Sequence, residues 1–175
     1  MQTLTAMKMA MKNKLLEQRA YTDAHTGLPN KSACEALLRD QNMIIEPTAC
    51  IMFDLNNLKT VNDTMGHLAG DRLIMNFSRL LRSVIPDKDF VGRYGGDEFM
   101  VVIYNTSKTE IEDILKQLSR EKDRLNSSGN NMPIDYACGW AISDADSECT
   151  IQMLLDKADY YMYENKQAYK KSKKS

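Results

Sequence analysis

The stretch that decides the fold is FVGRYGGDEFMVVIY, residues 90–104. Residues 90–94 and 98–104 are rich in β-branched and aromatic side chains, and Gly95-Gly96-Asp97 separates them. This combination predicts two strands joined by a tight hairpin. The glycine pair has two interpretations, which are a turn that requires positive φ and a main chain left bare for a phosphate or ribose. The acidic pair Asp97-Glu98 behind the glycines favours the second.

Upstream of this hairpin, TACIMFDL at residues 48–55 is a nearly continuous apolar run. It predicts a buried central strand with Asp54 close to its end. A further strand is expected over residues 134–142. Helices are expected over residues 2–21, 31–41, 57–62, 68–84, 109–125 and 151–169. Between residues 48 and 142 the order is strand, helix, strand, strand, helix, strand, which predicts an α+β sandwich with a ferredoxin-like βαββαβ core.

The length of 175 residues suits one domain with an extension. We expect a helix at 1–21, the folded domain at 22–170 and a basic tail at 171–175. Leu4, Met7, Met11, Leu15 and Leu16 recur at helical spacing in the first segment. Two alternatives stay open for it: a helix packed on its own domain, or a coiled-coil stalk that carries a signal from an upstream sensor.

Composition excludes several classes of function. Lys plus Arg is 23 and Asp plus Glu is 24, a formal net charge of −1, which argues against a nucleic-acid binder driven by bulk charge. No apolar run is long enough to cross a bilayer, so we expect no direct membrane insertion, although a longer parent protein could be tethered. The four cysteines lie far apart, without the spacing of a metal or redox motif. We therefore expect a reducing, cytoplasmic location.

Acidic residues are predicted to converge at one edge of the sheet. Asp54 lies at the end of the central strand, and Asp97 and Glu98 lie at the hairpin that neighbouring strands form. Converging carboxylates repel one another unless a cation lies between them. Oxygen ligands without His or Cys suit Mg²⁺ or Mn²⁺. Two such ions can bridge triphosphate oxygens during phosphoryl transfer.

A second polar cluster runs from Asn56 to Asp71. Lys59 follows Asp54 closely, where a cation would face a phosphate. Asn62 and Asp71 together match the donors and acceptors of guanine, whereas the alternative is helix capping. His67 either caps a helix or contacts the nucleotide.

Four motifs, in order along residues 22–170, resemble those of GGDEF domains, the diguanylate cyclases. Arg93 to Phe99 resembles the family's hairpin. Asp23 to Lys31 resembles D-x-L-T-G-L-x-N-R, with His25 for Leu and Lys31 for Arg. Residues 54–71 resemble D-x-D-x-F-K-x-x-N-D-x-x-G-H-x-x-G-D, and residues 158–166 resemble A-D-x-A-L-Y-x-A-K. The resemblance implies a nucleotidyl cyclase fold and the condensation of two GTP molecules into cyclic di-GMP and two pyrophosphates.

The resemblance also implies roles for particular residues. Asp54, Asp97 and Glu98 would hold two Mg²⁺ or Mn²⁺ ions together with the backbone carbonyl of Leu55. Asp97 and Glu98 would help to deprotonate the attacking ribose hydroxyl, and Lys59 would stabilise charge on the phosphates. The residues implied to contact the substrate are Asn62, His67, Asp71, Gly95, Gly96, Lys166 and Lys170. Each protomer of a homodimer would bind one GTP.

Several positions depart from the family pattern. Asn56 stands where Asp is usual, and Leu58 where Phe is frequent. Tyr169 replaces a Gly, and Lys170 replaces an Arg, which keeps the charge but loses the fork geometry. These departures leave the predicted metal ligands in place.

The product-inhibition motif R-x-x-D is incomplete. The corresponding segment here is Pro86-Asp87-Lys88-Asp89, and proline cannot form the bidentate contacts of an arginine. We therefore expect no tight product binding, which also disfavours a product-sensing effector. The alternative to an active cyclase is a degenerate domain that binds GTP and signals through protein contacts. Some relatives accept ATP, but Asp71 favours guanine because adenine has no N1–H.

Overall fold

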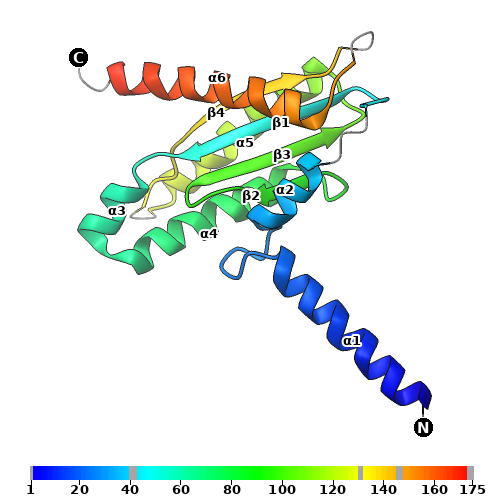
Figure 1. The fold of residues 1–175 in the computed structure, drawn as a ribbon. Coiled ribbons are helices and arrows are strands. Elements are labelled where there is room, and N and C mark those ends of the chain that lie inside the picture. The colour runs from blue at the N-terminus through cyan, green and yellow to red at the C-terminus, as the bar shows by residue number, and fades with distance from the viewer. Residues whose placement is uncertain (1, 40–42, 130–131, 145–147, 173–175) are drawn as a thin grey trace.

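The computed structural model describes residues 2–39, 43–129, 132–144 and 148–172. Figure 1 shows the elements in space. In chain order they are α1 (Gln2–Tyr21), α2 (Lys31–Arg39), β1 (Thr48–Leu55), α3 (Leu58–Met65), α4 (His67–Val84), β2 (Phe90–Arg93), β3 (Glu98–Tyr104), α5 (Lys108–Ser127), β4 (Tyr136–Ile142) and α6 (Ile151–Ser172).

The four strands form one antiparallel sheet in the order β2-β3-β1-β4. β1 is a central strand and is buried at all eight positions, as its apolar sequence predicts. β3 lies between β1 and β2, and β1 lies between β3 and β4, so two split β-α-β units interlock. The predicted ferredoxin-like α+β architecture is confirmed.

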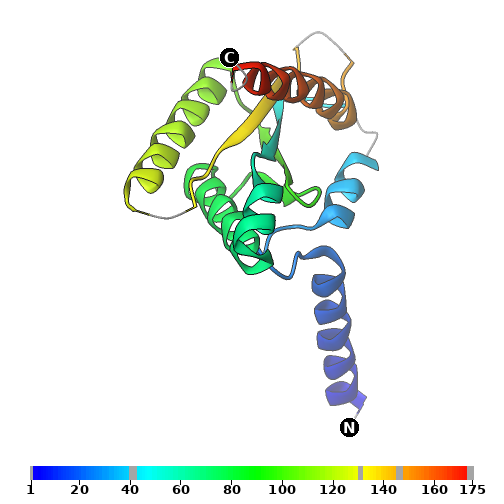
Figure 2. The same cartoon turned by 90° about the vertical axis from the view of Figure 1, so that its left-hand side faces the viewer.

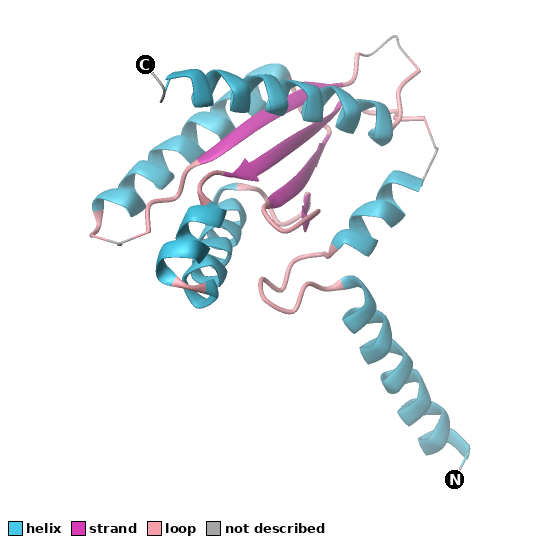
Figure 3. Cartoon of the chain, turned by 60° about the vertical axis from the view of Figure 1, so that its left-hand side comes forward, coloured by secondary structure: helices cyan, strands magenta, loops and turns pink. Residues whose placement is uncertain are grey.

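Helices cover both faces of the sheet (Figures 2 and 3). Because side chains alternate along a strand, Ile51 and Phe53 of β1 join a core with α4 and α5, which includes Phe77. Cys50 and Met52 join a second core with α2 and α6. The same alternation directs Asp54, two residues beyond Met52, toward α6. This orientation is what positions the acidic end of β1.

Helix α6 lies unusually close to β4. A Cβ atom on Gly139 would overlap backbone atoms of Ala158 and Met162. Only glycine therefore allows this approach, which brings the C-terminal half of α6 over the end of β1.

Several boundaries differ slightly from the sequence-based expectations. The helix expected at 57–62 is α3, which begins after Asn57 because that residue adopts a left-handed backbone with φ of 64°. The strand expected from residue 134 begins at 136, since the side chain of Asn126 takes both backbone hydrogen bonds of Ile134. The end of the helix expected at 31–41 lies outside the described residues.

Helix α1 projects away from the body of the molecule (Figures 1 and 2). Met7, Met11 and Leu16 are exposed, so these side chains do not pack on the domain. The end of α1 is attached through Asn30, which donates to the carbonyls of Ala20 and Tyr21 at 2.9 Å each. Among the described residues, no helix has the length and apolarity needed to cross a membrane.

Candidate active site

Asp54 is a buried carboxylate at the end of β1, with 8% of its side chain exposed. Lys166 of α6 donates to its Oδ2 atom at 2.6 Å, while Oδ1 is buried without a hydrogen-bond partner. Burial raises the pKa of Asp54 and the nearby charge of Asp97 raises it further, while Lys166 opposes both. A buried carboxylate with a free oxygen lacks full compensation for its charge. Asp54 is thus suited to bind a further cation.

The hairpin places Asp97 and Glu98 beside Asp54, as predicted. Asp54 and Glu98 are direct partners in the β1–β3 register, and the backbone N–H of Leu55 donates to the carbonyl of Asp97 at 2.8 Å. The pKa of Glu98 is raised by burial and by the charges of Asp97 and Asp54. A raised pKa brings a carboxylate closer to the range useful for proton transfer near neutral pH.

The two glycines of the hairpin do not serve a left-handed turn, so that interpretation was wrong. Neither Gly95 nor Gly96 has positive φ. A Cβ atom on Gly95 would press against the carboxylate of Glu98, whereas one on Gly96 would meet open space. Gly95 therefore makes room for Glu98, and Gly96 leaves the tip of the hairpin uncovered.

A partly buried ion pair that the sequence analysis missed holds this hairpin. Arg93 donates through Nη1 to both carboxylate oxygens of Asp23, at 3.1 and 3.2 Å, and through Nη2 to the carbonyl of Gly96 at 2.9 Å. Thr26 also donates to Asp23, from its backbone at 2.9 Å and its hydroxyl at 2.7 Å. Despite burial, the pKa of Asp23 is lowered, because the hydrogen bonds from Thr26 and the charge of Arg93 prevail. The Asp-x-x-Thr spacing was the available signal for this turn.

Two cavities flank the ion pair between Asp54 and Lys166. One, of about 570 Å³, extends from the end of β1 over the start of α3 to Asp97 and includes Lys59. The other, of about 470 Å³, lies between Glu98 and α6 and includes Asp159 and Tyr163. Lys166 and Lys170 line both. The first therefore places three lysines around the carboxylate of Asp97, an arrangement suited to a polyphosphate with its metal ion.

The predicted base-reading residues lie on consecutive helices. Asn62 is inside α3 and Asp71 is inside α4, so neither caps a helix, and the capping alternative was wrong. The amide of Asn62 lies directly against Gly70, where a Cβ atom would overlap its oxygen. Asp71 lies 3.6 Å from Nδ1 of His25. His67 is exposed at the first position of α4.

The donor set fits a magnesium ion that completes its coordination with substrate and water. No group of three or more His, Cys, Asp or Glu side chains in the described ranges lies close enough to enclose a metal. Mg²⁺ commonly binds one or two carboxylates together with substrate phosphates and waters. The unpaired Oδ1 of Asp54 beside Asp97 meets that requirement.

The departure at Asn56 has a structural reason. Asn56 is buried, and its side-chain amide donates to the carboxylate of Asp135 at 3.3 Å. The backbone N–H of Asn56 donates to the backbone carbonyl of Asp135 at 2.9 Å. An aspartate here would set two carboxylates against each other, so Asn56 ties β1 to the segment before β4.

Asp89 of the incomplete product-inhibition motif is part of the fold. It is buried, and its Oδ1 atom accepts a hydrogen bond from the backbone N–H of Tyr104 at 3.1 Å. Its exposed neighbour Pro86 contributes a backbone carbonyl to the turn, accepting from the N–H of Asp89 at 3.0 Å. The segment therefore offers no fork-shaped donor and no exposed Asp89 carboxylate to a ligand.

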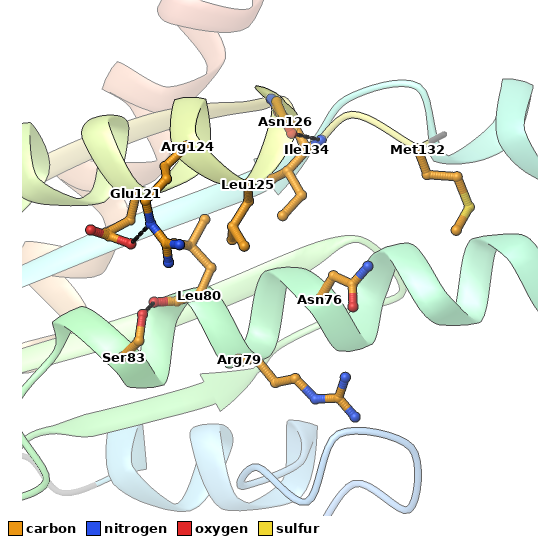
Figure 4. A pocket seen from close by; sticks show the side chains of 10 residues that line it. All are labelled: Asn76, Arg79, Leu80, Ser83, Glu121, Arg124, Leu125, Asn126, Met132 and Ile134. Carbon is orange, nitrogen blue, oxygen red and sulfur yellow. Dashed lines mark hydrogen bonds and ion pairs between the residues drawn. The ribbon is translucent and has the colours of Figure 1, made fainter. Parts of the chain in front are cut away.

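A third cavity, of about 320 Å³, lies between α4 and α5 (Figure 4). Its wall includes Leu80 and Leu125, and at its edge Arg124 donates to Glu121 at 2.8 Å. Since α4 and α5 cover the face of the sheet opposite to α6, this cavity does not contribute to the site around Asp54.

Comparison with known proteins agrees with this fold. The family profile described as "Diguanylate cyclase, GGDEF domain" matches residues 20–172. Diguanylate cyclase A of Treponema denticola is 27% identical over 91% of this chain, and the cyclic di-GMP phosphodiesterase PdeB of Shewanella oneidensis is 32% identical over 82%. The chain belongs to the GGDEF family.

The structural comparison supports the fold independently. The coiled coil and GGDEF domain of DgcB from Caulobacter crescentus, in complex with c-di-GMP, superposes with a TM-score of 0.80. That match covers 95% of this chain and 91% of the other at 20% identity. This chain spans only 45% of the length of the Treponema cyclase and 17% of PdeB.

Proposed function

We propose that this chain is a diguanylate cyclase domain that joins two GTP molecules into cyclic di-GMP and releases two pyrophosphates. The observation that carries the proposal is the juxtaposition of Asp54, Asp97 and Glu98 beside a cavity lined by lysines. A domain that had lost catalysis would have no need to keep Asp54 and Glu98, whose pKa values are raised by burial and by the nearby charge of Asp97.

The proposed cation site uses Asp54 and Asp97 with the carbonyl of Leu55, and Glu98 lies beside Asp54 in the adjacent strand. One or two Mg²⁺ or Mn²⁺ ions bound there would neutralise phosphate charge during phosphoryl transfer. Asp54 binds through its unpaired oxygen, and Lys166 balances the other oxygen at 2.6 Å.

The lysines and the hairpin have separate roles in the proposed reaction. Lys59, Lys166 and Lys170 line the cavity where the phosphates would lie and stabilise their negative charge. Glu98, with Asp97 beside it, accepts the proton of the attacking ribose hydroxyl. Gly96 leaves the hairpin tip open for the ribose, and Gly95 sets the position of Glu98.

Guanine is the base that suits Asn62 and Asp71. A carboxylate accepts hydrogen bonds from N1–H and from the 2-amino group, and an amide can bond the remaining polar atoms on the edge of the base. His67 lies at the start of the same helix as Asp71. An adenine has neither donor at these positions, so ATP would be a poor substrate.

Two copies of the domain are required by this chemistry, since each bound GTP attacks the α-phosphate of the other. The projecting helix α1, with Met7 and Met11 exposed, favours the coiled-coil stalk of the two alternatives left open for residues 1–21. A parent protein with an upstream sensor and a cytoplasmic catalytic domain is part of this proposal. The alternative, a GTP-binding domain without turnover, is kept because a phosphodiesterase is among its relatives.

The proposal is tested by incubating the protein with GTP and Mg²⁺ and identifying the product by mass. We expect cyclic di-GMP and pyrophosphate, with an initial rate that rises faster than linearly with protein concentration. Asp97→Ala should lower the rate by about 100-fold or more. Asp113→Ala, which removes an exposed carboxylate of α5, is the matched control and should retain the rate. GTP binding without pyrophosphate release from the unaltered chain would favour the degenerate alternative.

A further inference from the structure

The loop between α1 and α2 is a tightly hydrogen-bonded turn. The N–H of Asp23 donates to the carbonyl of Leu28 at 2.7 Å, and the N–H of Gly27 donates to the carbonyl of Asp23 at 2.9 Å. Thr26 closes the turn on the side chain of Asp23, and Gly27 supplies the positive φ of 71°. The backbone on both sides of His25 is therefore fixed.

This turn carries His25 to the carboxylate of Asp71 in α4. The Nδ1 atom lies 3.6 Å from Oδ1, a direct polar contact that is longer than a hydrogen bond. Both side chains are accessible, at 49% and 38%. An exposed pair of this kind contributes little to folding stability, so stability does not explain the contact.

The other predicted base-reading residue, Asn62, lies against the residue that precedes Asp71. The amide of Asn62 lies against the α-carbon of Gly70, the residue before Asp71, and a methyl group there would displace it. Asn62 of α3 therefore lies beside Gly70, and His25 of the loop lies beside the Asp71 carboxylate. A carboxylate has about four acceptor positions, and a polar neighbour beside one oxygen restricts how the carboxylate is oriented.

We propose that His25 is a positioning residue for base recognition, which directs the free acceptor positions of Asp71 toward N1–H and the 2-amino group of guanine. The inference rests on the proposed function and goes beyond the family pattern, where Leu is usual at this position and cannot form a polar contact. Inosine nucleotides keep N1–H but lack the 2-amino group. His25 therefore contributes to the preference for guanine over hypoxanthine.

The turn also connects the guanine-recognition residue Asp71 with the catalytic hairpin. Asp23, two residues before His25, accepts from Arg93, and Arg93 donates to the carbonyl of Gly96. A single rigid loop thus contacts both the base-reading carboxylate and the support of the catalytic hairpin. Loss of His25 should disturb only the first contact, because the turn itself is closed by Asp23 and Thr26.

The test compares the equilibrium binding of GDP and IDP in the presence of Mg²⁺, since neither nucleotide carries a pyrophosphate leaving group. His25→Leu should weaken GDP binding roughly threefold to tenfold, the scale of one oriented hydrogen bond. IDP binding should change less, so the GDP-to-IDP affinity ratio falls. His25→Gln, which keeps a donor, should restore most of the ratio. Ala24→Leu is the matched control, an exposed position on the same turn, and should leave the ratio unchanged.

The outcomes separate the inference from the proposed function. A wild-type preference for GDP that persists unchanged in His25→Leu overturns the inference alone. No binding of either nucleotide to the wild-type protein overturns both. With GTP as substrate, the expected result for His25→Leu is a raised KM with kcat unchanged, and an equal loss in kcat would contradict a positioning role in binding.

Discussion

At the scale of single residues, the site depends on charges that are buried and held by specific partners. Arg93 is the centre of this arrangement, because it bonds Asp23 on one side and the carbonyl of Gly96 on the other. Both members of the ion pair are largely buried, with 16% and 20% of their side chains exposed. Removing one partner would leave a buried charge unpaired, which costs more than the loss of an exposed pair.

Asp23→Asn should lower the free energy of unfolding at pH 7 by about 2 kcal/mol. Because the folded-state pKa of Asp23 is lowered from its ordinary value near 3.8, its contribution is fully present above that value and is lost as the pH falls below it. The difference in free energy of unfolding between the wild-type protein and Asp23→Asn should stay constant from pH 7 to about 5 and shrink below about 4. Urea denaturation at several pH values measures it.

Glu35→Gln is the matched control for this prediction. It removes the exposed pair with Arg39 at 3.4 Å on α2, and the change should be under about 0.5 kcal/mol. An Asp23→Asn variant whose deficit did not shrink in acid would contradict the assigned ionisation.

The residue scale also shows what the sequence could predict. Asp97 and Glu98 follow a glycine pair, and Asp54 ends an apolar run, so local pattern alone brought them to one edge of the sheet. The contact between Lys166 and Asp54 joins residues 112 positions apart, and the pattern gave no reason to pair them. Lys166 was expected on phosphates by resemblance, and the structure adds its ion pair with the buried carboxylate of Asp54.

At the scale of elements, α6 determines the shape of the site. It contributes Lys166 and Lys170 to both flanking cavities, and its height above the sheet is fixed where Gly139 of β4 faces its backbone. The sequence predicted α6 and β4 well, but it could not predict their close contact. That distance depends on a glycine whose partners come from a different element.

Gly139→Ala should destabilise the fold by about 3 kcal/mol, because the new methyl group meets helix backbone that cannot rotate away. The activity proposed above should also fall, since α6 carries Lys166. Gly129→Ala is the matched control, where φ is 82° and nothing lies within 4 Å; it should cost about 1 kcal/mol from backbone strain alone. Equal urea midpoints for the two variants would show that α6 moves away without cost.

At the scale of the whole molecule, the proposed function leads to the expectation of little control by the product. Asp89, the retained residue of the inhibitory motif, is buried and bonded to the backbone of Tyr104. Pro86 replaces the arginine that the motif requires. The sequence predicted that the arginine of the motif is missing at position 86, where Pro86 stands. Only the structure shows that Asp89 has a structural role.

Cyclic di-GMP should therefore bind weakly and leave the initial rate unchanged at micromolar concentration. Isothermal titration calorimetry with the wild-type protein and with Asp97→Ala measures the binding directly. Tight binding that survives Asp97→Ala and disappears in Asp89→Ala would contradict this prediction. A thermal unfolding measurement of Asp89→Ala is needed beside it, because loss of the bond to Tyr104 should lower stability as well.

The pairing of Asp54 with Glu98 has a consequence for how this protein can change over evolution. Side chains along β1 alternate between the two cores, so inserting or deleting one residue before Asp54 would exchange the two faces of the strand. The carboxylate would then enter the aromatic core around Phe77, and Phe53 or Leu55 would occupy the acidic edge. Length changes that preserve this chemistry should accordingly come in pairs within the strand, or be confined to the loops outside it.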